Sequence, residues 1–264
     1  MLLEVCGETL NIHYIDEGGN NKGTPVLLLH GWGARAENYR CIIDMLTPHF
    51  RVIAPDMPGF GESDEPQTPF DAENYADFVR AFCEKLGINS VFIIGHSHGG
   101  RTAIKLLSSA KTTLEIPKAI LIDSAGLIRK KSLNQKFKIA KFKLAKKLFG
   151  IKIISSKFPD MIEKMRRKNG SADYASASPV MRRSMVSVIN EDLSESLCKI
   201  SCPTLLIWGE KDNDTPMYQA EKMRSLIPDC GLVTIKNGGH FSFLSDPGLT
   251  RRVLYSFLGV NTAV

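Results

Sequence analysis

Short apolar runs recur along the chain, and most are followed by a polar or glycine-containing loop and then by a segment with apolar residues at helical spacing. Such runs are typical of buried strands. The predicted strands span 10–15, 25–29, 51–54, 90–94, 118–123, 203–208 and 231–235, and the predicted helices 36–47, 73–86, 98–110, 217–227 and 247–257. This alternation predicts an α/β fold with a mostly parallel sheet covered on both faces. Ligands in such folds bind outside the C-terminal ends of the strands.

The alternation stops between residues 126 and 195. That stretch contains many helix-forming residues and no alternating strand pattern. A chain of 264 residues is long enough for one compact domain that carries an insertion. We therefore expect a core formed by 1–125 and 196–264, interrupted by a helical, Lys/Arg-rich cap at 126–195.

The pentapeptide Gly95-His96-Ser97-His98-Gly99 carries the most specific chemistry. An apolar run leads into it, and a helical pattern follows at once. A G-x-S-x-G sequence between a strand and a helix places the serine on a sharp turn, with its hydroxyl exposed above the sheet. The helix start beneath it supplies N–H groups and a positive dipole end, which suit the stabilisation of an oxyanion. The segment therefore predicts a nucleophilic serine.

A serine hydroxyl becomes a good nucleophile when an adjacent base accepts its proton. Asp212 lies in the loop after the predicted strand 203–208, and His240 lies in the loop after 231–235. Histidine titrates near neutrality, so it can take up the proton and return it. A buried carboxylate holds the imidazole in the required tautomer. The sequence therefore predicts a catalytic triad of Ser97, Asp212 and His240.

Two other acids, Glu210 and Asp214, compete with Asp212 for the third position of the triad. The spacing to Pro216 and to the end of the preceding strand favours Asp212. These alternatives stay open at the level of the sequence.

Several other polar residues near the predicted loops invite a chemical role. His96 and His98 flank the serine, but no further ligand follows at metal-binding spacing, so we expect packing residues and no metal site. His30 is expected to form structural hydrogen bonds. Asp56 and Ser63 are expected to shape a loop.

The motifs occur together in a recognisable order. They comprise His30-Gly31, the run at 56–63, the elbow at Ser97, Trp208-Gly209 before Asp212, and Gly239-His240. In this order and spacing the chain resembles the α/β-hydrolase superfamily along almost its whole length. The resemblance implies the α/β-hydrolase fold, with a helical cap over the active site and no cofactor. It also implies an oxyanion hole formed by the backbone N–H groups of Trp32 and His98.

Residues 30–64 resemble, more narrowly, the pimeloyl-ACP methyl ester esterases of biotin synthesis and their carboxylesterase relatives. This likeness covers the N-terminal third of the chain. It implies an ester substrate that is either a small molecule or bound to an acyl carrier. The expected activity is therefore that of a carboxylesterase-like serine hydrolase that cleaves carboxylic esters, with thioesters as an alternative.

The residues at the motifs argue against some of the other activities of the superfamily and leave others open. Haloalkane dehalogenases and epoxide hydrolases of this fold use aspartate at the elbow, so Ser97 argues against both. C–C bond hydrolases often carry Gly-Pro-Gly where this chain has Trp32-Gly33-Ala34. Hydrolysis of C–C or amide bonds remains an alternative, and so does a ligand receptor that keeps the triad and turns over slowly.

Composition and the cysteine pattern predict the compartment in which the protein resides. The content of 43% hydrophobic and 23% charged residues is ordinary for a soluble protein. The N-terminus lacks the basic and apolar regions of a signal peptide, and no run approaches 18 apolar residues, so we expect no integral membrane segment. Six scattered cysteines are typical of reduced thiols, and Cys198 with Cys202 forms an isolated pair unsuited to zinc. We expect a cytoplasmic protein.

Positive charge is concentrated in the expected cap. Residues 126–195 contain 17 Lys and Arg against 6 Asp and Glu, whereas the whole chain has 34 and 28. The densest part, 136–150, predicts a helix with a lysine-rich face and an imperfect apolar face. Such a face is typical of a solvated surface, with docking of an acidic partner such as an acyl carrier protein, or of an anionic membrane, as the alternative. No reading module for nucleic acid accompanies the lysines.

Overall fold

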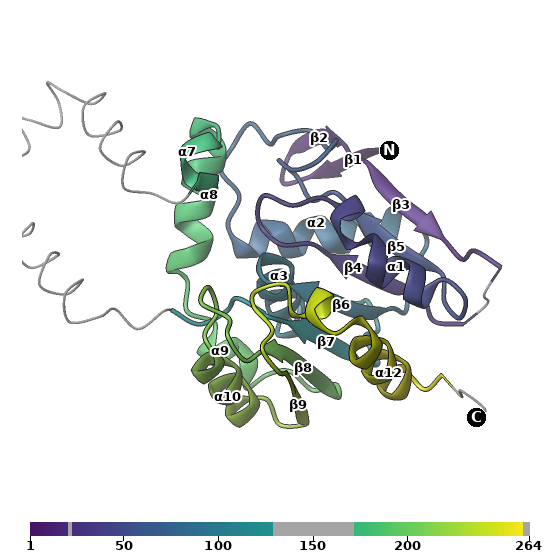
Figure 1. Cartoon of the computed structure of the whole chain (residues 1–264). Coiled ribbons are helices and arrows are strands. Elements are labelled where there is room, and N and C mark those ends of the chain that lie inside the picture. Colours follow the sequence, from purple (N-terminus) through teal and green to yellow (C-terminus); the bar gives the residue numbers. More distant parts are fainter. Residues whose placement is uncertain (21–22, 129–171, 261–264) are drawn as a thin grey trace, which may run out of the picture.

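The computed structural model describes residues 1–20, 23–128 and 172–260. Seven strands form the central sheet in the order β3-β5-β4-β6-β7-β8-β9 (Figure 1). They are β3 (Tyr14–Glu17), β4 (Val26–Leu29), β5 (Val52–Pro55), β6 (Phe92–His96), β7 (Ala119–Ile122), β8 (Thr204–Gly209) and β9 (Cys230–Ile235). Strand β3 is antiparallel to β5, and every other pair is parallel. The predicted α/β fold is confirmed.

Helices cover both faces of the sheet because successive side chains of a strand point to opposite sides. One face packs against α2 (Ala72–Lys85), α3 (His98–Leu107) and α10 (Met217–Leu226). The other packs against α1 (Arg40–Leu46) and α12 (Pro247–Leu258). In β4, for example, Leu27 and Leu29 belong to the first apolar cluster, while Leu28 belongs to the second.

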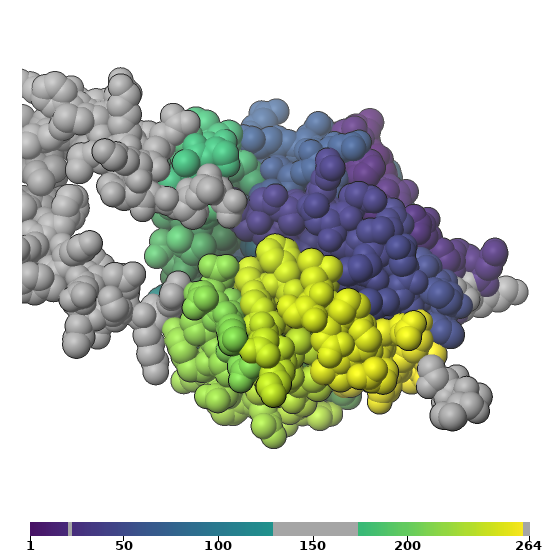
Figure 2. All heavy atoms as spheres, viewed as in Figure 1, coloured from purple at the N-terminus to yellow at the C-terminus, as the bar shows by residue number. Residues whose placement is uncertain are grey.

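The outer surface shows how the second face is closed. Figure 2 shows the yellow C-terminal region, which contains α12, lying against the dark blue region that contains α1. The Tyr255 hydroxyl donates a hydrogen bond to the Met45 carbonyl, 2.6 Å away, and the rings of Tyr255 and His49 meet edge to face. These contacts fasten the two helices beside each other over the sheet.

The N-terminal prediction needs a correction. The strand expected at 10–15 is wrong in its bounds, because the region forms β1 (Leu2–Val5) and β2 (Glu8–Asn11) as a separate hairpin before β3. Cys6 and Gly7 both have positive φ, 52° and 79°, as a tight hairpin turn requires. After the hairpin, the chain is held beside the loop that contains Ser63, because the N–H of His13 donates to Ser63 Oγ.

The helix expected at 36–47 is divided. It begins as a 3₁₀ turn, η1 (Ala36–Tyr39), and continues as α1. The buried carboxylate of Asp56 accepts the N–H groups of Ala36 and Glu62, at 2.6 and 2.9 Å, and lies 3.1 Å from His13 Nδ1. Asp56 thus shapes its loop, as the sequence predicts, and fixes the start of η1.

The described part of the expected insertion contains α7 (Ala172–Ser176) and α8 (Pro179–Asn190), and α9 (Ser194–Leu197) crosses its expected end at residue 195. Helix α8 is joined to the core because the Phe70 N–H donates to Ser184 Oγ at 2.9 Å. The two ends of the insertion meet, since the Leu193 N–H donates to the Gly126 carbonyl at 2.9 Å. The lysine-rich stretch 136–150 lies outside the described residues, so its helix and the cap boundaries remain predictions.

Two further expectations concern the described residues. None of the helices among 1–20, 23–128 and 172–260 has both the length and the apolarity needed to cross a membrane. All six cysteines are free thiols, and burial raises the pKa of Cys83 to about 12.

Candidate active site

Ser97 occupies a strained turn between β6 and α3. Its φ of 51° and ψ of −111° lie in a region that non-glycine residues rarely adopt. The turn is held on both sides, because the Ser97 N–H donates to the Ile122 carbonyl and the Ser97 carbonyl accepts from Ala125 and Arg101. This geometry leaves the serine half-buried at the C-terminal edge of the sheet, at the start of a helix.

The glycines around Ser97 are required by close packing. A Cβ on Gly99 would lie 2.1 Å from the carbonyl oxygen of Leu29, and one on Gly95 would lie 2.6 Å from the carbonyl oxygen of Gly99. Neither neighbour can yield, because both are backbone atoms inside the sheet–helix contact. The G-x-S-x-G pattern therefore reflects how closely α3 approaches β4 and β6.

Ser97, His240 and Asp212 are brought into one hydrogen-bonded line. Ser97 Oγ lies 3.0 Å from His240 Nε2, and His240 Nδ1 lies 2.9 Å from Asp212 Oδ2. A carboxylate accepts, so this line assigns the proton to Nδ1 and leaves Nε2 free to accept the serine proton. The three residues follow β6, β9 and β8, whose C-terminal ends share one edge of the sheet.

The acid loop shows which carboxylate is hydrogen-bonded to His240. Asp212 Oδ1 accepts the N–H groups of Asp214 and Thr215, and Oδ2 accepts the Thr215 hydroxyl. Burial opposes its charge, but the hydrogen bonds from His240 and Thr215 hold the pKa of Asp212 below its usual value. Glu210 instead accepts the N–H of Asn237, and its side chain forms no described contact with His240.

The protonation of His240 reflects its acidic surroundings. Burial disfavours the charged imidazole, yet hydrogen bonding to Asp212 and the charges of Asp212, Asp214 and Asp123 raise the pKa of His240 above its usual value. The imidazole is thus a stronger base than a free histidine. A higher proton affinity favours its acceptance of the serine proton.

Asp123 is a buried polar residue that sequence reasoning missed. Its Oδ1 accepts the Gly209 N–H at 2.8 Å, and its Oδ2 accepts the Ser242 N–H at 2.9 Å. It therefore joins the start of the Asp212 loop to the segment after His240. Burial raises its pKa to about 7, against the lowering effect of these hydrogen bonds. The available signal was an aspartate at the C-terminal end of an otherwise apolar strand.

His96 also has a larger role than packing. The Tyr39 hydroxyl lies 2.7 Å from His96 Nδ1, and His96 Nε2 lies 2.7 Å from the His240 carbonyl oxygen. The carbonyl requires a proton on Nε2, so Nδ1 accepts from Tyr39. Burial lowers the pKa of His96 to about 3, which keeps the ring neutral. His96 thus connects the elbow to the backbone of His240.

The loop after β4 lies beside the serine. His30 is buried, with Nδ1 2.7 Å from the Gly31 carbonyl oxygen and Nε2 accepting the Met57 N–H at 2.8 Å, as expected of a structural histidine. The backbone N–H groups of Trp32 and His98 form no hydrogen bond with any described residue. Both residues line the same cavity as Ser97, so their N–H groups are available to an oxyanion.

A cavity of about 820 Å³ opens at this site. Helix α8 contributes an apolar wall of Met185, Val188 and Ile189. The aromatic residues Trp32, Tyr39 and Phe241 also line the cavity. Such a volume, mostly apolar with a few polar groups beside a nucleophile, is typical of a small-molecule site.

The same residues can be examined as metal ligands. Asp212, Asp214 and His240 offer ligand atoms within 4.8 Å of one another, and no other group of three such residues is found among the described parts of the chain. Asp212 and His240 are bonded to each other, and Asp212 also accepts three hydrogen bonds from its own loop. The lone pairs that Asp212 and His240 would offer to a cation are thus used within the triad and its loop.

Comparisons with known proteins agree with the fold and the motif order. The model of the α/β-hydrolase fold family matches residues 24–247. A 2-hydroxy-6-oxo-6-(2'-aminophenyl)hexa-2,4-dienoic acid hydrolase of Metapseudomonas resinovorans is 29% identical over 262 residues, covering 93% of this chain and 86% of that protein. Lipase 3 of Moraxella sp. (strain TA144) is 28% identical over 244 residues, covering 85% of this chain and 74% of the lipase.

Solved structures give the same result for the fold. An esterase from Thermogutta terrifontis, determined with malate bound, superposes with a TM-score of 0.73 at 24% identity, covering 98% of this chain and 97% of the esterase. The family model spans the sheet strands from β4 to β9, the elbow and the three loops that carry Ser97, Asp212 and His240. The chain therefore belongs to the α/β-hydrolase fold family and is a hydrolase.

Proposed function

We propose that this hydrolase cleaves carboxylic esters through an acyl-enzyme formed on Ser97. The observation that carries the proposal is the continuous line from Ser97 Oγ through His240 to Asp212, at 3.0 and 2.9 Å, beside two backbone N–H groups without partners among the described residues. This arrangement supplies a nucleophile, a base and an oxyanion hole at one edge of one cavity.

In the first half of the reaction, Ser97 Oγ attacks the ester carbonyl carbon while its proton passes to His240 Nε2. The carbonyl electrons move to the oxygen, and the N–H groups of Trp32 and His98 stabilise the oxyanion. When the tetrahedral intermediate collapses, the bond to the alcohol oxygen breaks and His240 returns its proton to that oxygen. Asp212 stabilises the charged imidazole throughout.

In the second half, a water molecule takes the place of the alcohol. His240 removes its proton as the water oxygen attacks the acyl carbon, and the second tetrahedral intermediate releases the carboxylic acid. Ser97 Oγ regains the proton from His240. The products are therefore one acid and one alcohol, with the enzyme unchanged.

The choice of esters is supported by the lipase and esterase relatives and by the apolar cavity wall from α8. An apolar wall suits an acyl chain or an alkyl alcohol. A thioester would react by the same steps. An acyl carrier protein as the source of the acyl group is a further expectation, and it depends on the basic segment outside the described residues.

The test is steady-state hydrolysis of p-nitrophenyl esters with acyl chains from C2 to C12, with Ser97→Ala in parallel. We expect saturable turnover that peaks at one chain length and falls by at least about 10⁴-fold in the variant. The far-ultraviolet spectrum and melting temperature of Ser97→Ala should match those of the parent. Retained turnover in a folded Ser97→Ala protein would disprove the acyl-enzyme on Ser97.

A second candidate activity is cleavage of a C–C bond. It is favoured by one observation, the 29% identity over 93% of this chain to the hexa-2,4-dienoic acid hydrolase. An assay with that relative's own substrate class distinguishes the two. Faster turnover of the dienoic acid than of any ester in the panel would favour C–C hydrolysis, and the reverse would favour esters. Turnover that stops after one equivalent on every substrate would favour the receptor alternative.

A further inference from the structure

Arg101 is a buried cation in the wall of the catalytic cavity. It lies one turn into α3, where its N–H donates to the Ser97 carbonyl, and only 3% of its surface is exposed. Its side chain lines the same cavity as Ser97 and His240. A buried charge normally has a partner of opposite sign, because an isolated ion loses its hydration on burial and nothing replaces it.

No such partner is found for Arg101 among the described residues. Its Nη1 donates to the backbone carbonyl of Glu191 at 2.7 Å, but no described carboxylate lies within the 4.0 Å of an ion pair. A carbonyl oxygen carries only a partial charge. The guanidinium retains other N–H donors, and these are left for whatever enters the cavity.

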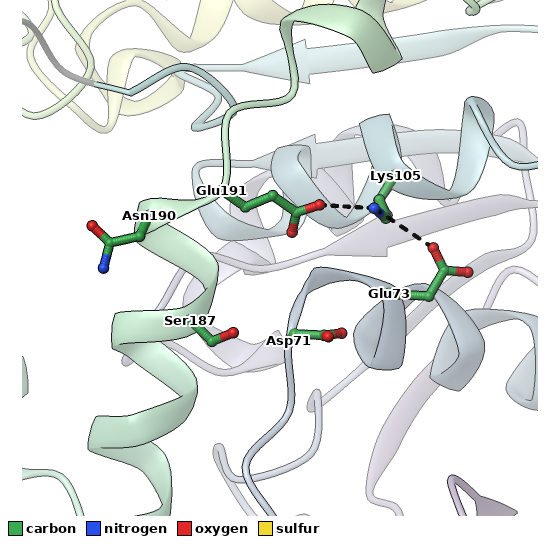
Figure 3. A pocket seen from close by; sticks show the side chains of 6 residues that line it. All are labelled: Asp71, Glu73, Lys105, Ser187, Asn190 and Glu191. Atoms are coloured by element: carbon green, nitrogen blue, oxygen red, sulfur yellow. Dashed lines mark hydrogen bonds and ion pairs between the residues drawn. The ribbon is translucent and has the colours of Figure 1, made fainter.

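The nearest acids are already engaged elsewhere. The Glu191 carboxylate is turned toward Lys105, at 2.7 Å, and Lys105 also lies 3.7 Å from Glu73 (Figure 3). The Asp192 carboxylate accepts the N–H groups of Ser194 and Ile128. The Glu191 carboxylate therefore forms its ion pair with Lys105 and forms none with Arg101.

Arg101 keeps its charge under ordinary conditions. Burial lowers its pKa to about 10, against the raising effect of the more distant Glu191 and Asp192 charges, and this leaves the guanidinium protonated at neutral pH. His98 is the polar neighbour on the same turn, and burial together with Arg101 holds the pKa of His98 well below its usual value. The ring is thus neutral and adds no second positive charge beside Arg101.

The surroundings indicate where an anion would sit. Arg101 and Ser97 are separated by one helical turn, about 6 Å along the axis. The apolar side chains of Met185 and Val188 line the cavity with them. The one acidic residue among those described as lining the cavity, Asp214, is exposed, whereas Arg101 is buried.

We propose that Arg101 binds a carboxylate carried by the substrate, so that the preferred substrate is an ester with a free carboxylate at one end. This inference rests on the proposed function, because it names the substrate class of the same site. The ester carbonyl lies at Ser97, the intervening methylene groups lie against α8, and the carboxylate accepts N–H donors from Arg101. Planar guanidinium and carboxylate groups match in geometry and charge.

The test uses two pairs of esters that differ only by a carboxylate in place of a methyl group. Monomethyl adipate and methyl hexanoate place it on the acyl side, whereas 4-acetoxybutanoate and butyl acetate place it on the alcohol side. For at least one pair we expect wild-type kcat/KM to be higher for the anionic member. Arg101→Gln should lower the ratio of anionic to neutral kcat/KM at least tenfold, and Arg101→Lys should lower it less because the charge stays.

Arg51→Gln is the matched control, because Arg51 is paired with Asp16 outside the cavity and the same net charge is removed. Its ratio should equal that of the wild type. Equal ratios in wild type and Arg101→Gln, or an equal fall in Arg51→Gln, would overturn the inference while ester turnover left the proposed function standing.

If wild type hydrolyses neither these four esters nor any p-nitrophenyl ester of the panel, the proposed function fails and binding decides the inference. Calorimetry on Ser97→Ala then compares monomethyl adipate with methyl hexanoate, and 4-acetoxybutanoate with butyl acetate. Tighter binding of an anionic member that is lost when Arg101→Gln is added supports the carboxylate site. Equal binding of both members in both pairs overturns it.

Discussion

The hydroxyl of Tyr39 lies 2.7 Å from Nδ1 of His96 and accepts the N–H of Gly31 at 2.8 Å. Because His96 in turn contacts the carbonyl of His240, one buried chain of hydrogen bonds runs from the loop after β4, through the elbow, to the histidine loop. Three segments of the active site are thereby fixed relative to one another by hydrogen bonds outside the line from Ser97 to Asp212. Tyr39 is a positioning residue.

Tyr39→Phe should reduce both stability and activity. It leaves the Gly31 N–H and His96 Nδ1 buried without a partner, so we expect a loss of about 1 to 3 kcal/mol in the free energy of unfolding. The displaced loops should lower kcat by roughly 10-fold to 100-fold. Denaturant unfolding and steady-state kinetics measure the two effects.

Tyr255→Phe serves as the control for that prediction, since the Tyr255 hydroxyl bonds the Met45 carbonyl away from the active site. It should cost about 1 kcal/mol or less and leave kcat unchanged. A Tyr39→Phe enzyme with wild-type kcat would show that the hydrogen-bonded chain has no part in positioning the active site.

Asp212→Asn, compared with Asp214→Asn, should show which of the two aspartates is the acid of the triad. An amide cannot hold His240 in the tautomer with a proton on Nδ1, so we expect kcat to fall by about 10⁴-fold. Asp214→Asn, which removes an exposed charge from the same loop, should lower kcat less than about tenfold. The reverse order in steady-state assays would transfer the role to Asp214.

The activity should depend on the protonation of His240. The neutral imidazole is the base, so kcat/KM should be lost as pH falls through the His240 pKa, with a midpoint above the usual value of 6.5. Asp214→Asn removes one of the charges that raise this pKa, and the midpoint should move to lower pH. Asp16→Asn, an exposed charge paired with Arg51, should leave the midpoint in place. A midpoint that rises in Asp214→Asn would contradict the electrostatic account.

Gly99→Ala should damage the fold itself. The added Cβ would lie 2.1 Å from the Leu29 carbonyl oxygen, so β4 and α3 must separate, and we expect a loss of at least about 3 kcal/mol in the free energy of unfolding. Gly19→Ala meets nothing within 4 Å and should change stability by less than about 0.5 kcal/mol. Similar melting temperatures for the two variants would refute the close-packing argument.

Much of the fold could be predicted from the sequence because buried parallel strands are nearly continuous apolar runs. The runs that became β4, β5 and β8 were recognised to within one or two residues. The N-terminal region was predicted poorly because its strands are short and partly exposed, so periodicity alone could not divide it at Cys6 and Gly7.

The candidate site shows a similar division. The order of Ser97, Asp212 and His240 could be predicted because each follows an apolar strand within a few residues. Asp123 and Tyr39 could not, since their importance comes from contacts with residues far away in the chain: Asp123 with Gly209 and Ser242, for example. Such pairings depend on which strands become neighbours, and no local pattern encodes that.

The hydrogen bond between Leu193 and Gly126 has a consequence for how this protein can change over evolution. Backbone atoms alone join Gly126 to Leu193, so side-chain changes in the residues between them leave this junction in place. The reacting groups and the wall contributed by α8 are therefore encoded in separable stretches of the gene. Insertions, deletions and exchanges between those two anchor points can give descendants new preferences while the inherited chemistry stays intact.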